Sequence, residues 1–283
     1  MANPASSTLR NFTGITEAGP LIIEPVTAAS LALTVSTVIT TAGHTYRLPT
    51  IKEDPQAAWI AEGEEIPTSE AVADEVSVVP RKVAGLSVIS NELANDTSPE
   101  AATTIGDGLG RDIARKVDAA FFGPAPTGAA AAVQPGGLES LAASVTTVTA
   151  DPAGGLSAYI DGLAEAEALG VTLRAWVVDP ATARALAKLT TGTGSNLPLF
   201  GTGATNGIDR NALGVPLLVS PYVVAGTAWG IPDGRVFSVL REDVTVDVDK
   251  SAFFTTDQTA IRAIARIGFG FVQSKAVVKI KAA

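Results

Sequence analysis

Two groups of carboxylates are the first candidates for chemistry in this sequence. One group lies in an acidic, proline-punctuated segment, and the other alternates along a strand-like run. The first group is Glu62, Glu64 and Glu65, and the second is Asp243, Asp247 and Asp249. Acid–base catalysis needs a pocket or a close charge that shifts a carboxyl pKa, and the glutamates lie on a charged surface segment with no apolar pocket. The aspartates lack the spacing and the glycine of a calcium loop. We interpret the first group as a solvated acidic tip and the second as a solvated strand face.

The numbers of cysteine and histidine residues limit which nucleophiles and metal sites the chain can contain. The chain has no cysteine and a single histidine, His44. Disulfides, thiolate nucleophiles and multi-histidine metal centres are therefore excluded. A Ser-His-Asp triad would have to use His44, for which a structural role is the simpler interpretation.

A glycine-rich stretch between Thr190 and Asn211 invites comparison with phosphate-binding loops. Gly201 to Gly207 has the pattern Gly-x-Gly-x-x-Asn, and no Gly-Lys-Ser/Thr follows. Both nucleotide-binding fingerprints therefore fail in detail, and we predict a surface loop. The sequence predicts no catalytic, cofactor-binding or metal-binding residue, and no enzymatic activity.

Length and charge limit the partners. The chain has 283 residues, of which 46% are hydrophobic and 17% charged, enough for one large domain or two smaller ones. A net charge of −9 argues against gripping nucleic acid through its phosphates, although enclosing nucleic acid remains compatible with it. The uncharged run from Pro25 to Gly43 is too rich in Ser and Thr for a membrane span. We expect a soluble protein made in the cytoplasm.

The residues from Tyr46 to Phe122 predict a protruding two-stranded arm followed by a long helix. The returning strand of the arm is expected over Val76 to Ser90, with Pro80 at an edge or a bulge. Trp59 lies between charged residues. It either folds inward or packs on a neighbouring molecule.

The helix is predicted over 98–122. Ser98 can cap it, and Pro99 suits its first turn. An apolar residue recurs every four positions, at Ile105, Leu109, Ile113, Val117 and Phe121. Three glycines interrupt the helix at a cost of about 1 kcal/mol each relative to alanine, which indicates that something packs closely against it. They are Gly106, Gly108 and Gly110.

The remaining elements mix helices and strands, so the fold class is α+β. Leu31, Leu33 and Val35 alternate as in a half-buried strand. Helices are predicted over Leu156–Leu169 and Ala181–Leu189. Strands are predicted over Leu173–Val178, Val215–Ser220, Val236–Leu240, Val244–Val248 and Ile261–Val272. In the last of these, odd-numbered apolar residues from Ile261 to Phe271 form one face, and Arg262, Ile264, Arg266, Gly268 and Gly270 form the other.

The order of these landmarks resembles the tailed-phage major capsid proteins of the Hong Kong 97 type. The matching segments run from about Leu21 to Ile280. They include Tyr46-Arg-Leu-Pro, Ala58-Trp-Ile-Ala-Glu-Gly, Val76-Ser-Val-Val-Pro-Arg-Lys-Val-Ala, Trp176-Val-Val-Asp-Pro, Leu213-Gly-Val-Pro-Leu-Leu-Val-Ser and Phe254-Thr-Thr-Asp-Gln-Thr-Ala-Ile-Arg. No single motif is diagnostic, but their joint order and spacing are.

The resemblance implies the fold of that family, with an arm, an extended loop, and a peripheral and an axial domain. The implied divisions are an N-terminal arm at 1–27, peripheral parts at 28–47, 84–140 and 236–268, an extended β-hairpin loop at 48–83, a spine helix at 98–122, an axial domain at 141–235 and a C-terminal segment at 269–283 that returns to the axial domain.

The implied function is self-assembly into hexamers and pentamers that form the icosahedral head of a tailed double-stranded DNA bacteriophage. The implied partners are other copies of the chain, with scaffolding, portal and cement proteins possible, and DNA that is enclosed without sequence-specific binding. The implied location is the virion head, assembled in the bacterial cytoplasm. An encapsulin-type bacterial compartment shell is the alternative. Because the chain begins with Met1 close to the arm, we expect scaffolding to come from a separate protein or not to be required.

Some members of this family form a Lys-to-Asn isopeptide crosslink with the help of a Glu. Here the arm region offers only Lys52 and Lys82, both away from the tip, and no Asn lies between Val236 and Gly268. We therefore predict that no such crosslink forms. Arg262 and Arg266 are expected to face either the solvent or acidic neighbours across a subunit boundary.

Overall fold

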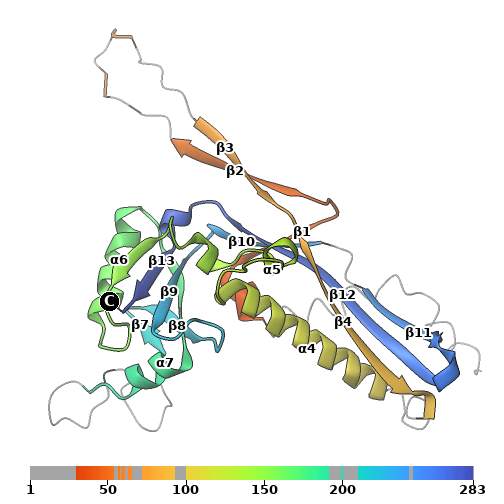
Figure 1. Ribbon diagram of the computed structural model, residues 1–283. Coiled ribbons are helices and arrows are strands. Elements are labelled where there is room, and N and C mark those ends of the chain that lie inside the picture. Colours follow the sequence, from red (N-terminus) through yellow and green to blue (C-terminus); the bar gives the residue numbers. More distant parts are fainter. Residues whose placement is uncertain are drawn as a thin grey trace, which may run out of the picture.

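In the part of the chain that the structure describes, the main elements are two large β-sheets, one long helix and a projecting two-stranded hairpin (Figure 1). The computed structural model describes residues 30–53, 57, 59–60, 63–65, 72–92, 100–190, 199, 210–241 and 245–282. The helices and short helical turns are α2 (Leu31–Val35), α4 (Glu100–Phe122), α5 (Ala130–Val133), η2 (Leu138–Leu141), α6 (Ser157–Ala168), α7 (Pro180–Ala187), η3 (Phe254–Thr256) and η4 (Ser274–Ala276). Among the described residues, no helix is long and apolar enough to cross a membrane.

A five-stranded sheet forms the long side of the body. It contains β1 (Thr37–Thr41), β4 (Arg81–Ser90), β10 (Val236–Arg241), β11 (Thr245–Phe253) and β12 (Gln258–Phe271). The long strand β12 pairs antiparallel with β4, β10 and β11, and β1 adds to β10 in parallel. The period-two prediction for β12 is confirmed, since Ile261, Ala263 and Ala265 are buried.

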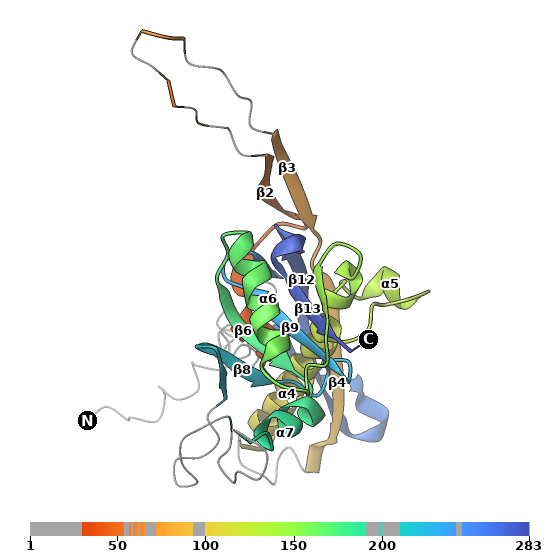
Figure 2. The same ribbon diagram turned by 90° about the vertical axis from the view of Figure 1, so that its left-hand side faces the viewer.

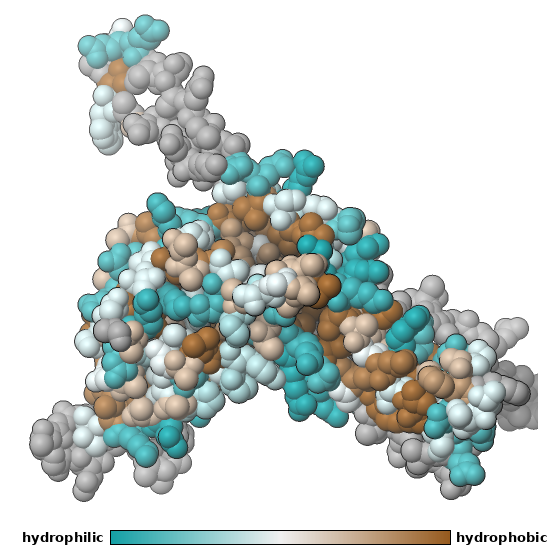
Figure 3. Space-filling model, in the orientation of Figure 1, coloured by the Kyte–Doolittle hydropathy of each residue, from teal (hydrophilic) through white to brown (hydrophobic). Residues whose placement is uncertain are grey.

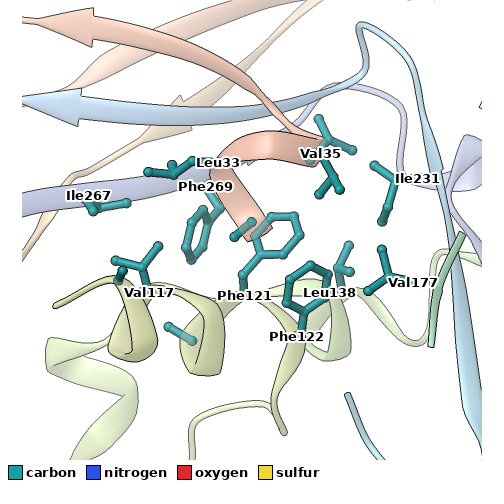
Figure 4. Packing of buried hydrophobic residues seen from close by; sticks show 14 of the residues in the cluster. Leu33, Val35, Val117, Phe121, Phe122, Leu138, Val177, Ile231, Ile267 and Phe269 are labelled. Carbon is teal, nitrogen blue, oxygen red and sulfur yellow. The ribbon is translucent and has the colours of Figure 1, made fainter. Parts of the chain in front are cut away.

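Helix α4 packs on one face of this sheet through its predicted apolar stripe. Ile113, Val117 and Phe121 are buried, and the Phe121 ring meets the Phe269 ring edge to face at 4.9 Å between centroids (Figure 4). Ser98 and Pro99, the predicted start of the helix, lie outside the described residues.

The prediction that something packs closely against the three glycines of α4 is wrong within the described part of the chain. A Cβ added at Gly106 or Gly110 would meet no described atom within 4 Å, and one at Gly108 would meet only the end of Arg111 at 3.8 Å.

A six-stranded sheet forms the other half of the body. Its strand order is β5-β13-β9-β6-β8-β7. The strands are β5 (Thr146–Thr149), β6 (Leu173–Val178), β7 (Asn211–Ala212), β8 (Val215–Val219), β9 (Thr227–Pro232) and β13 (Val278–Lys281). Alternate residues of β6 enter two different cores: Val177 joins the core around α4, while Trp176 packs against Tyr159 of α6 at 5.2 Å between ring centroids. This sheet is therefore covered on both faces, which explains why every residue of β6 except the exposed Arg174 is apolar and buried.

Several predicted helix boundaries are confirmed by their capping geometry. The Asp179 carboxylate accepts hydrogen bonds from the backbone N–H groups of Ala181 and Thr182, which begins α7 at Pro180. Helix α6 is followed by Gly170 at a φ of +67°, whose N–H donates to the carbonyl of Glu167.

The predicted strand through Leu31, Leu33 and Val35 is wrong, because these residues form the short helix α2. Ser30 caps this helix, and the Asp118 carboxylate accepts hydrogen bonds from the Leu31 and Ala32 N–H groups. An acceptor 86 residues away in sequence thus satisfies the donors of the first turn, which no local pattern reveals.

The predicted returning strand over Val76 to Ser90 is two strands with different partners. Strand β3 (Val72–Val78) pairs with β2 (Tyr46–Glu53) in the projecting hairpin, whereas β4 belongs to the five-stranded sheet. Pro80 lies in the break between β3 and β4. The hairpin points away from the body in both views, and β4 continues from the break along the long side of the body (Figures 1 and 2).

Candidate assembly surfaces

The projecting hairpin is fixed to the body at its base. Leu48 and Val78 are buried there against Val239 of β10. Gly268 and Gly270 of β12 provide the room, since a Cβ at Gly268 would lie 2.7 Å from Val78 and a Cβ at Gly270 would overlap Leu48. The two glycines therefore let the hairpin backbone approach the sheet closely, which stiffens its root.

Beyond this base, the described part of the hairpin has little contact with its own chain. Arg47 and Glu75 form an exposed ion pair at 3.3 Å. Trp59 has an exposed fraction of 105%, and Glu64 and Glu65 are exposed as well. Of the two alternatives for Trp59, inward folding is therefore wrong, and packing on a neighbouring molecule stays a prediction. Glu62 lies outside the described residues.

The face of the five-stranded sheet opposite α4 is a second exposed surface. On β4 it consists of Lys82, Ala84, Leu86 and Val88, which we call the outer face of β4; all four are exposed, Leu86 by 61% and Val88 by 40%. The residues between them face α4, as the 3.0 Å approach between Leu109 and a Cβ added at Gly85 indicates. Figure 3 shows a hydrophobic band over the part of the molecule formed by β4 and β12.

Charged residues of β11 and β12 border this surface. Arg262 pairs with Asp247 at 2.7 Å, so the Arg262 guanidinium meets an acidic partner within its own chain. Hydrogen bonds from the Ser251 side chain and backbone lower the pKa of the exposed Asp249 carboxyl. Asp243 lies outside the described residues, and no group of three metal-ligating side chains occurs among the described ones. A solvated strand face, as predicted, accounts for the two described aspartates.

Asp118 connects the long helix to α2. Both of its oxygens accept hydrogen bonds: the Ser30 hydroxyl donates at 2.7 Å and the Ala32 N–H at 2.9 Å to one, and the Leu31 N–H at 3.2 Å to the other. Burial raises the pKa of the Asp118 carboxyl, and these hydrogen bonds oppose the rise. The periodicity of α4 gave no indication of this role.

A nearly buried ion pair connects the C-terminal strand to the turn after α4. Lys279 Nζ of β13 lies 2.7 Å from both carboxylate oxygens of Glu139 in η2. The same ammonium lies 5.0 Å from the centroid of the Trp229 ring. Sequence inspection singled out neither residue, because 140 positions separate them.

The other candidates for chemistry do not converge. His44, for which a structural role was the simpler interpretation, is exposed in the turn between β1 and β2. Most of the glycine-rich stretch 190–211 lies outside the described residues. Within the described part of the chain, the structure brings no set of catalytic groups together, and its accessible features are surfaces.

Comparison with known proteins relates the chain to proteins that assemble into shells. The family model described as the phage capsid family matches residues 16–282. The capsid polyprotein of Pseudomonas phage PAJU2 is 28% identical over 196 residues, which cover 66% of this chain and 28% of that protein. The chain thus spans less than a third of that curated relative.

Solved structures share the fold at low sequence identity. A structure from Microbacterium phage Oxtober96 has a TM-score of 0.72 and 18% identity, with 90% of this chain and 91% of that chain covered. The capsid of a native GTA particle has a TM-score of 0.69 and 20% identity, with 90% of each chain covered. A structure from Mycobacterium phage Bobi has a TM-score of 0.70 and 19% identity, again with 90% of each covered. The expected Hong Kong 97-type α+β fold is confirmed, and the chain belongs to the phage capsid family.

Proposed function

We propose that this capsid protein is the subunit of an icosahedral phage head and assembles with copies of itself into hexamers and pentamers. The observation that carries the proposal is the stiffly rooted hairpin with a fully exposed Trp59 near its far end. A large aromatic side chain at the end of a projecting arm is unfavourable in water and is covered when a partner binds.

The domain divisions follow from the same proposal. The hairpin β2–β3 corresponds to the extended loop within 48–83, and the five-stranded sheet with α4 to the peripheral parts 28–47, 84–140 and 236–268. The six-stranded sheet corresponds to the axial domain at 141–235, to which the segment 269–283 adds β13. The N-terminal arm is assigned to residues 1–27, which lie outside the described ones.

The shell is proposed to hold together without an autocatalytic isopeptide bond. Lys82 lies on β4 and Lys52 in β2, neither at the tip of the hairpin. The acidic chain would enclose double-stranded DNA inside the head without gripping its phosphates. Portal, scaffolding and cement proteins are the further partners that we propose for assembly in the bacterial cytoplasm.

Assembly of the purified chain tests the proposal. We expect negative-stain electron microscopy to show closed shells, and light scattering to show a mass far above 28.7 kDa. A chain that remains monomeric at every concentration, alone and with the other head proteins of its source, would refute it. Particles with a tail and DNA separate a phage head from an encapsulin, which would carry protein cargo.

A further inference from the structure

Resting on this proposed function, we propose that helix α6 of one copy packs against helix α7 of a second copy, with an acidic row on α6 facing a basic row on α7. The acidic row is Asp161 and Glu165, and the basic row is Arg184 and Lys188, the C-cap residue of α7. All four residues are exposed. Both helices cover the six-stranded sheet, so this contact is separate from the hairpin and from the five-stranded sheet.

Each row places like charges side by side. Residues four positions apart lie on the same face of a helix, so the two carboxylates of α6 repel each other, and so do the two cations of α7. Helix α6 contains no basic residue and α7 no acidic one, so neither helix can neutralise its own row. Among the described residues, none of the four side chains has an ion-pair partner. A row of opposite charge alongside would relieve both repulsions.

An apolar row lies beside each charged row. On α6 it consists of Ile160, Ala164 and Ala168, and on α7 it consists of Ala181, Ala185 and Leu189. Ile160 is exposed by 52%, which is unfavourable for a large apolar side chain unless a partner covers it. The alanines are small, and the distance between two packed helix axes depends on the side chains at the contact. The two rows can therefore approach closely and interdigitate.

The order of the rows selects one orientation. On α6 each charged residue follows an apolar one, whereas on α7 each charged residue precedes an apolar one. Successive residues advance by about 100° around a helix, and the facing surfaces of two parallel helices turn in opposite directions. Opposite orders therefore bring the two charged rows to the same side when the helices run parallel. Asp161 then lies beside Arg184, and Glu165 lies beside Lys188, because both rows have a rise of about 6 Å between their charges.

A second copy of the chain is the partner that fits both rows. Helix α7 lies below α6 in both views (Figures 1 and 2), and no ion pair of the described residues joins the two rows within one chain. Nucleic acid would match only the basic row, whereas a second copy supplies both rows at the same spacing. The two surfaces differ, so the contact is head to tail, and its repetition closes a ring.

Charge reversal tests this pairing. The variants Asp161→Lys/Glu165→Lys and Arg184→Glu/Lys188→Glu should each lower the yield of particles by about tenfold or more, because two attractions become repulsions. Each variant then carries rows of one sign only, so equal amounts of the two variants should assemble again when mixed. The four substitutions combined in one chain should restore assembly as well. Restoration shows that the substituted chains fold.

The control reverses two exposed cations with the same spacing elsewhere. Arg111→Glu/Arg115→Glu on α4 changes the net charge as much as the α7 variant does, and should leave the yield of particles near that of the wild type. Wild-type yields from both single-helix variants, an equal loss in the control, or no restoration by either mixing or combination would overturn the proposal. Failure of the wild-type chain to form any particle would instead overturn the proposed function.

A crosslink distinguishes a head-to-tail contact from an isolated pair. The chain has no cysteine, so the double variant Ala164→Cys/Ala185→Cys carries only the two thiols of the proposed contact. A short bifunctional thiol reagent should convert its particles into a covalent ladder beyond the dimer on a denaturing gel. The control Ala164→Cys/Ala131→Cys, with an exposed position on α5, should stay monomeric. A ladder that ends at the dimer, or equal ladders in both variants, would overturn the head-to-tail contact.

Discussion

The ion pair between Lys279 and Glu139 gives the sharpest prediction for stability. Lys279→Met keeps most of the aliphatic stem but removes the ammonium that lies 2.7 Å from both oxygens of Glu139. The two side chains are exposed by only 11% and 14%. The Glu139 carboxylate would then remain nearly buried with no cation beside it.

The magnitude follows from the desolvation of that carboxylate. Removing one partner of a buried ion pair lowers the free energy of unfolding by about 3–5 kcal/mol. Because both side chains keep some exposure, we expect the lower end, about 3 kcal/mol. At about 2 °C per kcal/mol for a chain of this size, the midpoint of thermal unfolding should fall by about 6 °C.

Thermal unfolding of the unassembled chain, followed by circular dichroism, measures this change. The double variant Lys279→Met/Glu139→Leu removes both charges and should recover most of the loss, since an apolar pair of similar volume replaces a buried ion pair at little cost. Arg47→Met breaks an ion pair whose side chains are exposed by 72% and 59%, and should cost at most about 1 kcal/mol. A Lys279→Met loss no larger than that of Arg47→Met, or no recovery in the double variant, would refute the reasoning.

Three further predictions concern the hairpin root, the buried carboxylate and the particle. Gly270→Ala should lower the free energy of unfolding measured with urea by about 1–3 kcal/mol, because the added Cβ would lie 2.7 Å from Val78. Gly110→Ala in α4, where the added Cβ meets no described atom within 4 Å, should raise it by up to about 1 kcal/mol. Equal effects of the two variants would contradict this prediction. Burial raises the pKa of Asp118, so its contribution to stability is fully present below pH 3.8 and is lost as the pH rises through the folded pKa. The stability of the wild type relative to Asp118→Asn should therefore be greater at pH 4 than at pH 7, and the opposite order would show that the hydrogen bonds outweigh burial. Denaturing gels of untreated particles should show only the monomer, and a covalent ladder would contradict the proposed absence of an isopeptide bond.

Elements whose partners are close in sequence were predictable. Helix α7 begins at a local cap, Asp179, and the stripe of α4 repeats within each turn. The long strand β12 has a period of two that no helix could share. Each of these sequence patterns lies within a few residues of the element that it predicts.

Elements that depend on distant groups were not predictable. Helix α2 has only five residues, and it forms because Asp118 accepts its first N–H groups. Strand β9 has no alternating pattern, because all of its residues are buried. Its Gly230 is required by a distant contact, since a Cβ there would lie 2.7 Å from Trp176. An isolated helix as short as α2 is unfavourable in water, so only the tertiary contact decides its conformation.

The two glycines of β12 are unfavourable within a strand, and their presence there indicates a contact with a segment that is distant in sequence. Gly268 and Gly270 weaken the strand that contains them, yet they lie on the face that receives Val78 and Leu48 from the hairpin. A larger side chain at either position would push the root of the hairpin away from β10 and β12. The direction of the hairpin, and with it the position at which Trp59 is presented, therefore depends on the absence of two side chains far from the tip. Gly270→Ala should therefore have two measurable effects. It should lower the stability of the chain, and, because the root of the hairpin is displaced, it should leave Trp59 more exposed to solvent in assembled particles.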